Sequence, residues 1–188
     1  MSDFEYIMVF VSLILGLGIT QLLIGVVQII VNWKRTITFL PHTLSIFLIF
    51  ILHIQQWWVN YDLNETVEKW HFSYFVLMSL FPIILFIMSR LLFPINWEKD
   101  EVNLREFYLN NYRKFYLFGC LMFAGSIPLN WIMLELDWVA QQNQILLLCL
   151  MLIPVFFNTR RDWFHYGIAI VLSLIALFYV ILVNPNLT

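Results

Sequence analysis

Histidine is the residue type in this sequence best suited to hold haem or a metal ion inside a lipid bilayer. His53 lies deep within an apolar segment, whereas His42, His71 and His165 fall near the ends of such segments. A membrane haem needs two axial ligands at matching depth on neighbouring helices, and no second histidine shares the depth of His53. A His–Met pair is left open by the seven methionines. We therefore expect His53 to be a hydrogen-bonded structural residue, with no cofactor and no metal site.

Other familiar catalytic motifs are also missing. The sequence contains no HExxH, no Gly-rich phosphate loop and no GxSxG. No carboxylate lies near the centre of an apolar segment, although ion-coupled pumps and proton relays usually carry one there. The expectation is a protein without catalytic residues, that is, a non-enzymatic one.

Polar side chains gather in one half of the apolar segments and form a candidate intramembrane pocket. Asn130 follows Pro128, where the missing backbone hydrogen bond can open a kink. Lipid cannot satisfy an amide, so these side chains must face protein or water. The predicted pocket residues are His53, Gln55, Gln56, Asn60 and Asn130.

A second polar pattern follows the first apolar segment. Gly18, Gln21, Gly25 and Gln28 are separated by steps of three and four residues, which place them on one helix face. Two alternatives remain open for this stripe. It either packs against another helix, where glycine permits close approach, or it lines water in a cavity or pore. Ser12, Gly16 and Thr20 form another face of small residues at four-residue spacing.

Composition identifies the elements that must carry these side chains. The 188 residues are 62% hydrophobic and 12% charged, against ~45–50% and ~25% in soluble domains. A core this small cannot cover so much apolar surface, so lipid must cover it. The net charge of −2 also excludes nucleic acid as a partner, because binding phosphate needs a basic surface.

Six apolar segments are candidates to cross a hydrocarbon core of about 30 Å. They are residues 4–31, 39–61, 72–93, 112–134, 141–157 and 164–183, and the fifth is the shortest. The predicted fold is all-α, a polytopic membrane protein with six transmembrane helices in one domain, 1–188, and no soluble domain. Asn103 and Glu106 have capping-box spacing, which predicts a helix start there. We expect that helix to lie along the membrane surface as an elbow before the fourth segment.

Basic residues segregate to one side of this arrangement. Nine of them flank or occupy the loops 32–38, 94–111 and 158–163, and only Lys69 falls on the other side. The positive-inside rule places the basic side in the cytoplasm and both termini outside. We expect a rim there that faces anionic lipid headgroups. Its predicted members are Lys34, Arg35, Arg90, Arg113, Lys114, Arg160 and Arg161.

The beginning of the chain resembles a group of known proteins. Phe4-Glu5-Tyr6, followed by the run LGLGITQLL at 15–23, is similar to the start of small multi-pass bacterial membrane proteins that carry no assigned function. The resemblance covers mainly the first segment and implies a bacterial inner membrane. It implies no site residues.

Three functions are compatible with these patterns. The first is a membrane protein that self-associates into a homo-oligomer, as a pore, channel or membrane effector of a defence system does. The second is a small-solute transporter with its pocket between two three-helix halves. The third is an intramembrane haem or redox protein. The sequence names no substrate for any of them.

Overall fold

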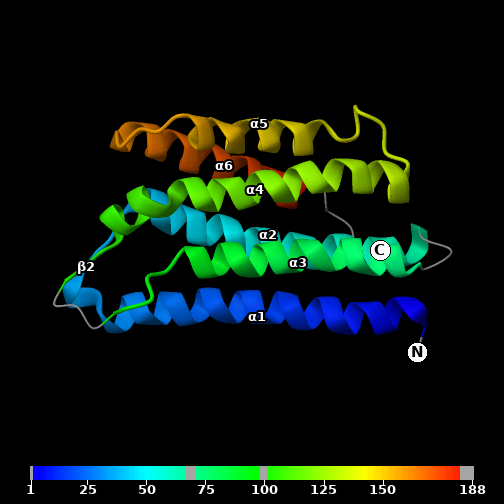
Figure 1. Ribbon diagram of the computed structural model, residues 1–188, viewed down its shortest axis with the longest axis horizontal. Helices are drawn as coiled ribbons and strands as arrows, with labels where there is room; N and C mark the ends of the chain where they lie inside the picture. The colour runs from blue at the N-terminus through cyan, green and yellow to red at the C-terminus, as the bar shows by residue number, and fades with distance from the viewer. Residues whose placement is uncertain (1, 67–70, 98–100, 183–188) are drawn as a thin grey trace.

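The computed structural model describes residues 2–66, 71–97 and 101–182, and these ranges contain six α-helices, most of which run along one long axis (Figure 1). Lys69, Lys99 and Val183, which the sequence patterns used, lie outside the described residues. The elements are α1 (Asp3–Val31), η1 (Trp33–Arg35), β1 (Thr36–Ile37), α2 (Leu40–Thr66), α3 (Phe72–Leu91), β2 (Val102–Asn103), α4 (Leu104–Leu134), α5 (Gln142–Phe156) and α6 (Asp162–Leu182). The prediction of an all-α fold is confirmed.

Helix length separates α5 from the others. By length and apolar composition, α1, α2, α3, α4 and α6 are each able to cross a membrane. Helix α5 has 15 residues, which at 1.5 Å per residue span about 22 Å of a core that is about 30 Å thick. Five of the six predicted spans are therefore supported by length and composition.

Local signals explain where helices begin. Ser2 and Glu5 form a capping box at α1: the Ser2 hydroxyl accepts from the Glu5 amide at 3.2 Å, and the Glu5 carboxylate accepts from the Ser2 amide at 2.8 Å. At α4 the Asn103 side chain accepts from the Glu106 amide at 3.0 Å. The predicted helix start at Asn103 is thus confirmed.

The predicted surface elbow before the fourth segment is wrong. Helix α4 is continuous for 31 residues from Leu104. Its buried face begins in the first turn, because Leu104, Tyr108 and Tyr112 are each at most 3% exposed. Since this apolar face continues without a proline until Pro128, the helix packs on its neighbours from its first residue instead of lying apart from them.

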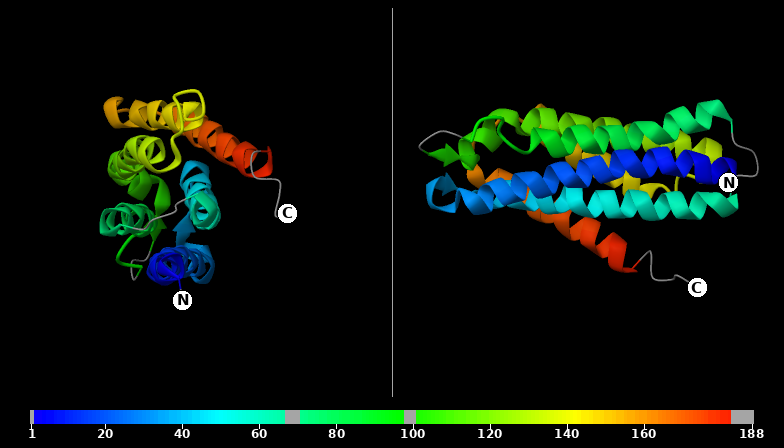
Figure 2. Two further views of the ribbon diagram at one scale, coloured as in Figure 1. Left: turned by 90° about the vertical axis from the view of Figure 1, so that its right-hand side faces the viewer. Right: turned by 90° about the horizontal axis from the view of Figure 1, so that it is seen from below.

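Packing between helices places α1 at one edge of the bundle. Helix α1 packs against α3 and α2, α4 packs against α5, and α2 packs against α6. Seen from the other directions, α6 crosses the bundle obliquely (Figure 2). A parallel pair of two-residue strands, β1 and β2, joins the α1–α2 and α3–α4 connections at one end. We call this the strand end of the bundle and the other the far end; α1 begins at the far end, and α6 runs from the strand end toward it (Figure 1).

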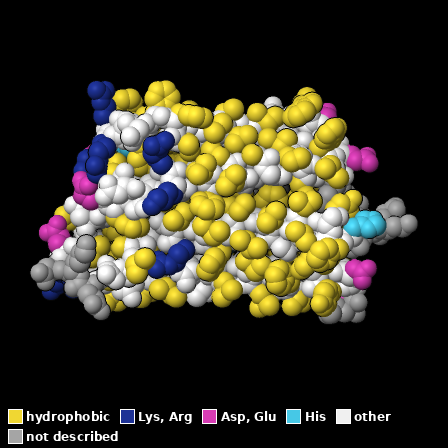
Figure 3. Space-filling view, in the orientation of Figure 1, with side chains coloured by type: hydrophobic (Ala, Val, Ile, Leu, Met, Phe, Trp, Pro, Cys, Tyr) yellow, Lys and Arg dark blue, Asp and Glu magenta, His cyan; other side chains and the backbone are white. Residues whose placement is uncertain are grey.

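The visible surface is apolar along most of its length, as a lipid-facing surface must be. In Figure 3 hydrophobic side chains cover the middle, and the Lys and Arg side chains lie toward the strand end. Large exposed side chains such as Leu13, Ile24 and Leu174 are 50–64% exposed. The surface is therefore apolar where that of a soluble domain is polar, and the interior is apolar as well.

Candidate functional site

A partly open cavity of about 130 Å³ lies between the helices toward the far end. It lies between the later part of α2, the early part of α3, the later part of α4, the early part of α5 and the later part of α6. Its described lining includes no Asp, Glu, Lys, Arg or His. Its polar lining residues are Gln55, Gln56, Asn60, Ser126, Asn130, Asn143, Gln144 and Tyr179.

The amides of this cavity are only partly paired with one another. The Gln56 Nε2 donates to the Asn60 Oδ1 at 3.0 Å. Asn60 is 1% exposed, and its Nδ2 has no hydrogen-bond partner among the described atoms; neither does the Oε1 of Gln144. A buried polar group without a partner is costly. The residues that line the cavity therefore include at least one buried donor and one buried acceptor without a partner among the described atoms.

Four of the five predicted pocket residues line this cavity, and His53 does not. Leu52 lines it, and the next residue is about 100° further round the helix. The His53 Nδ1 donates to the Ile49 carbonyl at 2.8 Å, and the ring packs on Gly18 of α1, where an added Cβ would overlap it. His53 was predicted in the pocket because it lies at a similar depth in the apolar segment to Gln55 and Gln56. Its side chain instead leaves α2 toward α1, so it packs on Gly18 and does not line the cavity.

The polar stripe of α1 is covered at its glycines by the same chain. Gly18 lies against His53, and an added Cβ at Gly25 would overlap the ring of Phe93. The Gln28 Oε1 accepts from the Asn32 side chain at 3.2 Å, and Gln21 is half-buried. These contacts favour the packing alternative for the stripe over the water-lined one.

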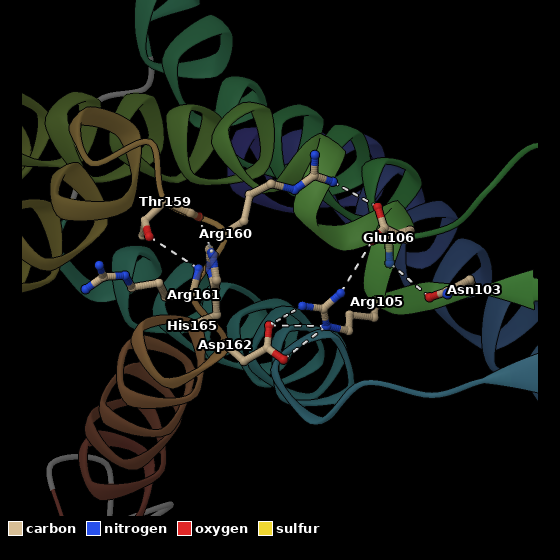
Figure 4. A network of polar contacts seen from close by, with 8 residues as sticks. All are labelled: Asn103, Arg105, Glu106, Thr159, Arg160, Arg161, Asp162 and His165. Carbon is tan, nitrogen blue, oxygen red and sulfur yellow. Dashed lines mark hydrogen bonds and ion pairs between the residues drawn. The ribbon is translucent and has the colours of Figure 1, made fainter.

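Residues of the predicted basic rim lie at the strand end, and several make defined contacts there. The Arg35 Nε donates to Asn32 at 2.9 Å, and Arg90 lies 3.4 Å from the Phe93 carbonyl. Figure 4 shows the network that joins α4 to the α5–α6 connection: Arg105 binds Asp162, and Arg160 binds Glu106 at 2.8 Å. The remaining members are Lys34, Arg113, Lys114 and Arg161.

Two other buried histidines form hydrogen bonds to backbone carbonyl groups at the strand end. The His42 Nε2 donates to the Leu92 carbonyl at 2.6 Å, and the His165 Nε2 donates to the Thr159 carbonyl at 2.9 Å. The His165 ring also lies edge-on to Tyr112, with centroids 4.6 Å apart. Within the described ranges, no three His, Cys, Asp or Glu side chains are placed to hold a metal ion.

Sequence reasoning missed the cavity residues of the later helices. Asn143 and Gln144 of α5 and Tyr179 of α6 all line it. A signal was present in the run Gln141-Gln142-Asn143-Gln144, since four consecutive amides at the start of an apolar segment are unusual for a lipid-facing turn. Comparison of the chain with protein-family models, with curated proteins and with solved structures finds no match.

Proposed function

We propose that this protein spans a membrane six times and binds a small uncharged solute in the amide-lined cavity, as a transporter does. The observation that carries the proposal is a cavity with an uncharged lining, in which the Asn60 donor and the Gln144 acceptor are buried without a partner among the described atoms. Following the resemblance of its first segment, we assign it to a bacterial inner membrane. The basic strand end supports a cytoplasmic position for that end and outer positions for both termini.

The chemistry of the lining defines the solute. An ion would lose its hydration there without a countercharge, which is expensive in a membrane interior. An amide, a urea or an alcohol presents both a hydrogen-bond acceptor and a donor. A cavity of about 130 Å³ is close to the ~150 Å³ engineered cavity that accepts benzene in another protein. The solute class is therefore a neutral, hydrogen-bonding molecule of about that size or smaller.

The position of the cavity supports transport rather than a purely structural void. Helices α2 and α3 of the first half and α4, α5 and α6 of the second half all contribute to it. Transporter sites lie between such halves, so that movement of one half against the other exposes the site to alternate sides.

Solute entry into liposomes tests this function. With purified protein in liposomes, we expect entry of urea, acetamide or glycerol, measured by light scattering, to exceed that of protein-free liposomes. Gln144→Leu removes the open acceptor and fills space, so it should slow entry about tenfold, the equivalent of roughly one hydrogen bond. Gln142→Leu is the matched control, because Gln142 is exposed and does not line the cavity. Entry at the protein-free rate for all three solutes would refute solute binding and transport here.

Self-association is a second proposal, supported by the exposed face of α1 that does not pack on the rest of the bundle. Gly16 is exposed there, with nothing within 4 Å of an added Cβ, and Thr20 one turn further on is also exposed. Small residues at this spacing let two helices approach closely in lipid. Such a homo-oligomer is the state in which a pore or an effector would act.

The oligomer is tested by a substitution that fills this face. Gly16→Leu should lower the oligomer fraction, measured by cross-linking in membranes, by at least about fivefold, since ~1 kcal/mol at a helix contact corresponds to that factor. Gly167→Leu on α6 makes the same change at another open glycine and should leave the oligomer intact. A monomeric wild-type protein, or equal behaviour of the two variants, would count against this interface.

A further inference from the structure

A second cleft lies at the strand end, remote from the amide-lined cavity. It has a volume of about 420 Å³ and lies between the first half of α4 and the α5–α6 connection. It is lined by Leu109, Asn110, Tyr112, Arg113, Asn158 and Arg160. Two arginines thus line one space from two segments of the chain. We call it the Arg113–Arg160 cleft.

Existing contacts position both arginines. The Arg113 Nε donates to the Val155 carbonyl at 3.1 Å, and an Nη of Arg160 donates to Glu106 at 2.8 Å and to Asn110 at 3.1 Å. A guanidinium carries five N–H donors. Each side chain is therefore held through one nitrogen, while the donors on its other nitrogens can reach an anion in the cleft.

The connection that carries Arg160 is itself fastened to α4. The Tyr112 hydroxyl lies 3.3 Å from the Phe157 carbonyl oxygen and 3.4 Å from that of Thr159. The Thr159 carbonyl also accepts from His165. Preorganised donors lose less freedom when a ligand binds, so a fixed loop favours binding.

Local charge favours an anion. Arg105 engages Asp162 through two nitrogens at 2.8–3.2 Å, so that carboxylate is already paired (Figure 4). Glu106 is shared between Arg105 and Arg160. Lys114 and Arg161 add positive charge to the same end. The basic groups thus outnumber the acidic ones around the cleft, and arginine is the residue that matches phosphate oxygens in a fork.

We propose that the Arg113–Arg160 cleft binds a phosphate group, and that this phosphate is the headgroup of an anionic glycerophospholipid. Free phosphate shares the same chemistry, but the surroundings favour a lipid. Trp163, three residues after Arg160, is 69% exposed, and exposed tryptophans are typical of membrane interfaces. Phe156 and Phe157, just before the cleft residue Asn158, are 77% and 64% exposed and add apolar surface there. The lipid source rests on the membrane insertion proposed above; it does not depend on solute transport.

Native mass spectrometry of the full-length protein in detergent tests the site, with phosphatidylglycerol as the probe and phosphatidylcholine as the neutral reference. We expect selective retention of phosphatidylglycerol by the wild type. Arg160→Gln and the double variant with Arg113→Gln should reduce that retention about 5-fold and 50-fold, as expected from charge-assisted hydrogen bonds. The Arg160 variant is expected to fold, because the Arg160 side chain is 61% exposed and its replacement leaves no cavity in the core.

The control is Lys114→Gln, which removes the same charge one residue from Arg113 at a position that does not line the cleft. It should change retention by less than about twofold, as an exposed charge does. An equal loss in Lys114→Gln would show that charge alone attracts the lipid and would overturn the cleft. Equal retention of the two lipids by the wild type would overturn it too. Displacement of phosphatidylglycerol by equimolar inorganic phosphate would overturn the lipid source and leave a soluble phosphate as the ligand.

Discussion

Replacing Gly18 with leucine should abolish the native packing of α1 on the rest of the bundle. An added Cβ would overlap the His53 imidazole, which is fully buried and bonded to its own helix. Overpacking a core costs about 1–3 kcal/mol for a few added methylenes and more when the neighbour cannot move. We expect the monodisperse fraction in size-exclusion chromatography to collapse, and any folded remainder to unfold about 5–10 °C lower.

The control and the rescue for this substitution are provided by the same chain. Gly167→Leu introduces the same side chain into α6 at a glycine where an added Cβ meets nothing within 4 Å, so it should fold as the wild type does. Adding His53→Ala to Gly18→Leu removes the colliding ring and should recover much of the folded fraction. If Gly18→Leu and Gly167→Leu were equally well folded, the packing of α1 on α2 would be refuted. A failure of His53→Ala to rescue would show that the ring is not the obstacle.

Cysteine labelling should give an all-or-none answer on how the helices cross the membrane. In a variant lacking Cys120 and Cys149, single cysteines replace Ile95, Ala140 or Phe157, which are exposed and lie in the α3–α4, α4–α5 and α5–α6 connections. On intact cells, an impermeant maleimide should label the position in the α4–α5 connection and neither of the others, because the proposed orientation places the basic connections in the cytoplasm. Permeabilisation should then expose all three.

The cysteine at position 157 tests α5 separately, because the 15 residues of this helix are few for a full crossing of the membrane. Labelling at 157 from outside, with 95 protected, would make α5 a re-entrant helix and refute the six-span topology. Labelling at 95 and 157 with 140 protected would instead reverse the orientation and keep the number of spans. The first labelling result would thus contradict the number of spans and the second the orientation. Neither result depends on what the protein transports or binds.

The sequence alone determined those features that depend on local order along the chain. Apolar length predicted the helices, because a helix in lipid must satisfy its own backbone with an unbroken run of apolar side chains. The Asn103–Glu106 spacing located the start of α4, since a cap acts across three residues. The segregation of nine basic residues also follows from counting along the chain. The amide residues of α2 and α4 were predicted as a pocket because lipid cannot satisfy them.

Tertiary structure decided which of these side chains meet. A helix places successive residues about 100° apart, so neighbours in the sequence can face different partners. Because α1 packs on one side of α2, His53 contacts Gly18, whereas Leu52, the residue before it, lines the cavity. The contributions of Gln144 and Tyr179 depend on where α5 and α6 pack, more than 80 residues beyond Asn60 of α2. The same holds for the pairing of Arg113 with Arg160 across one cleft. Such contacts depend on the angles and distances between helices. These result from the packing of all six helices together, so they cannot be predicted from the sequence of any one segment.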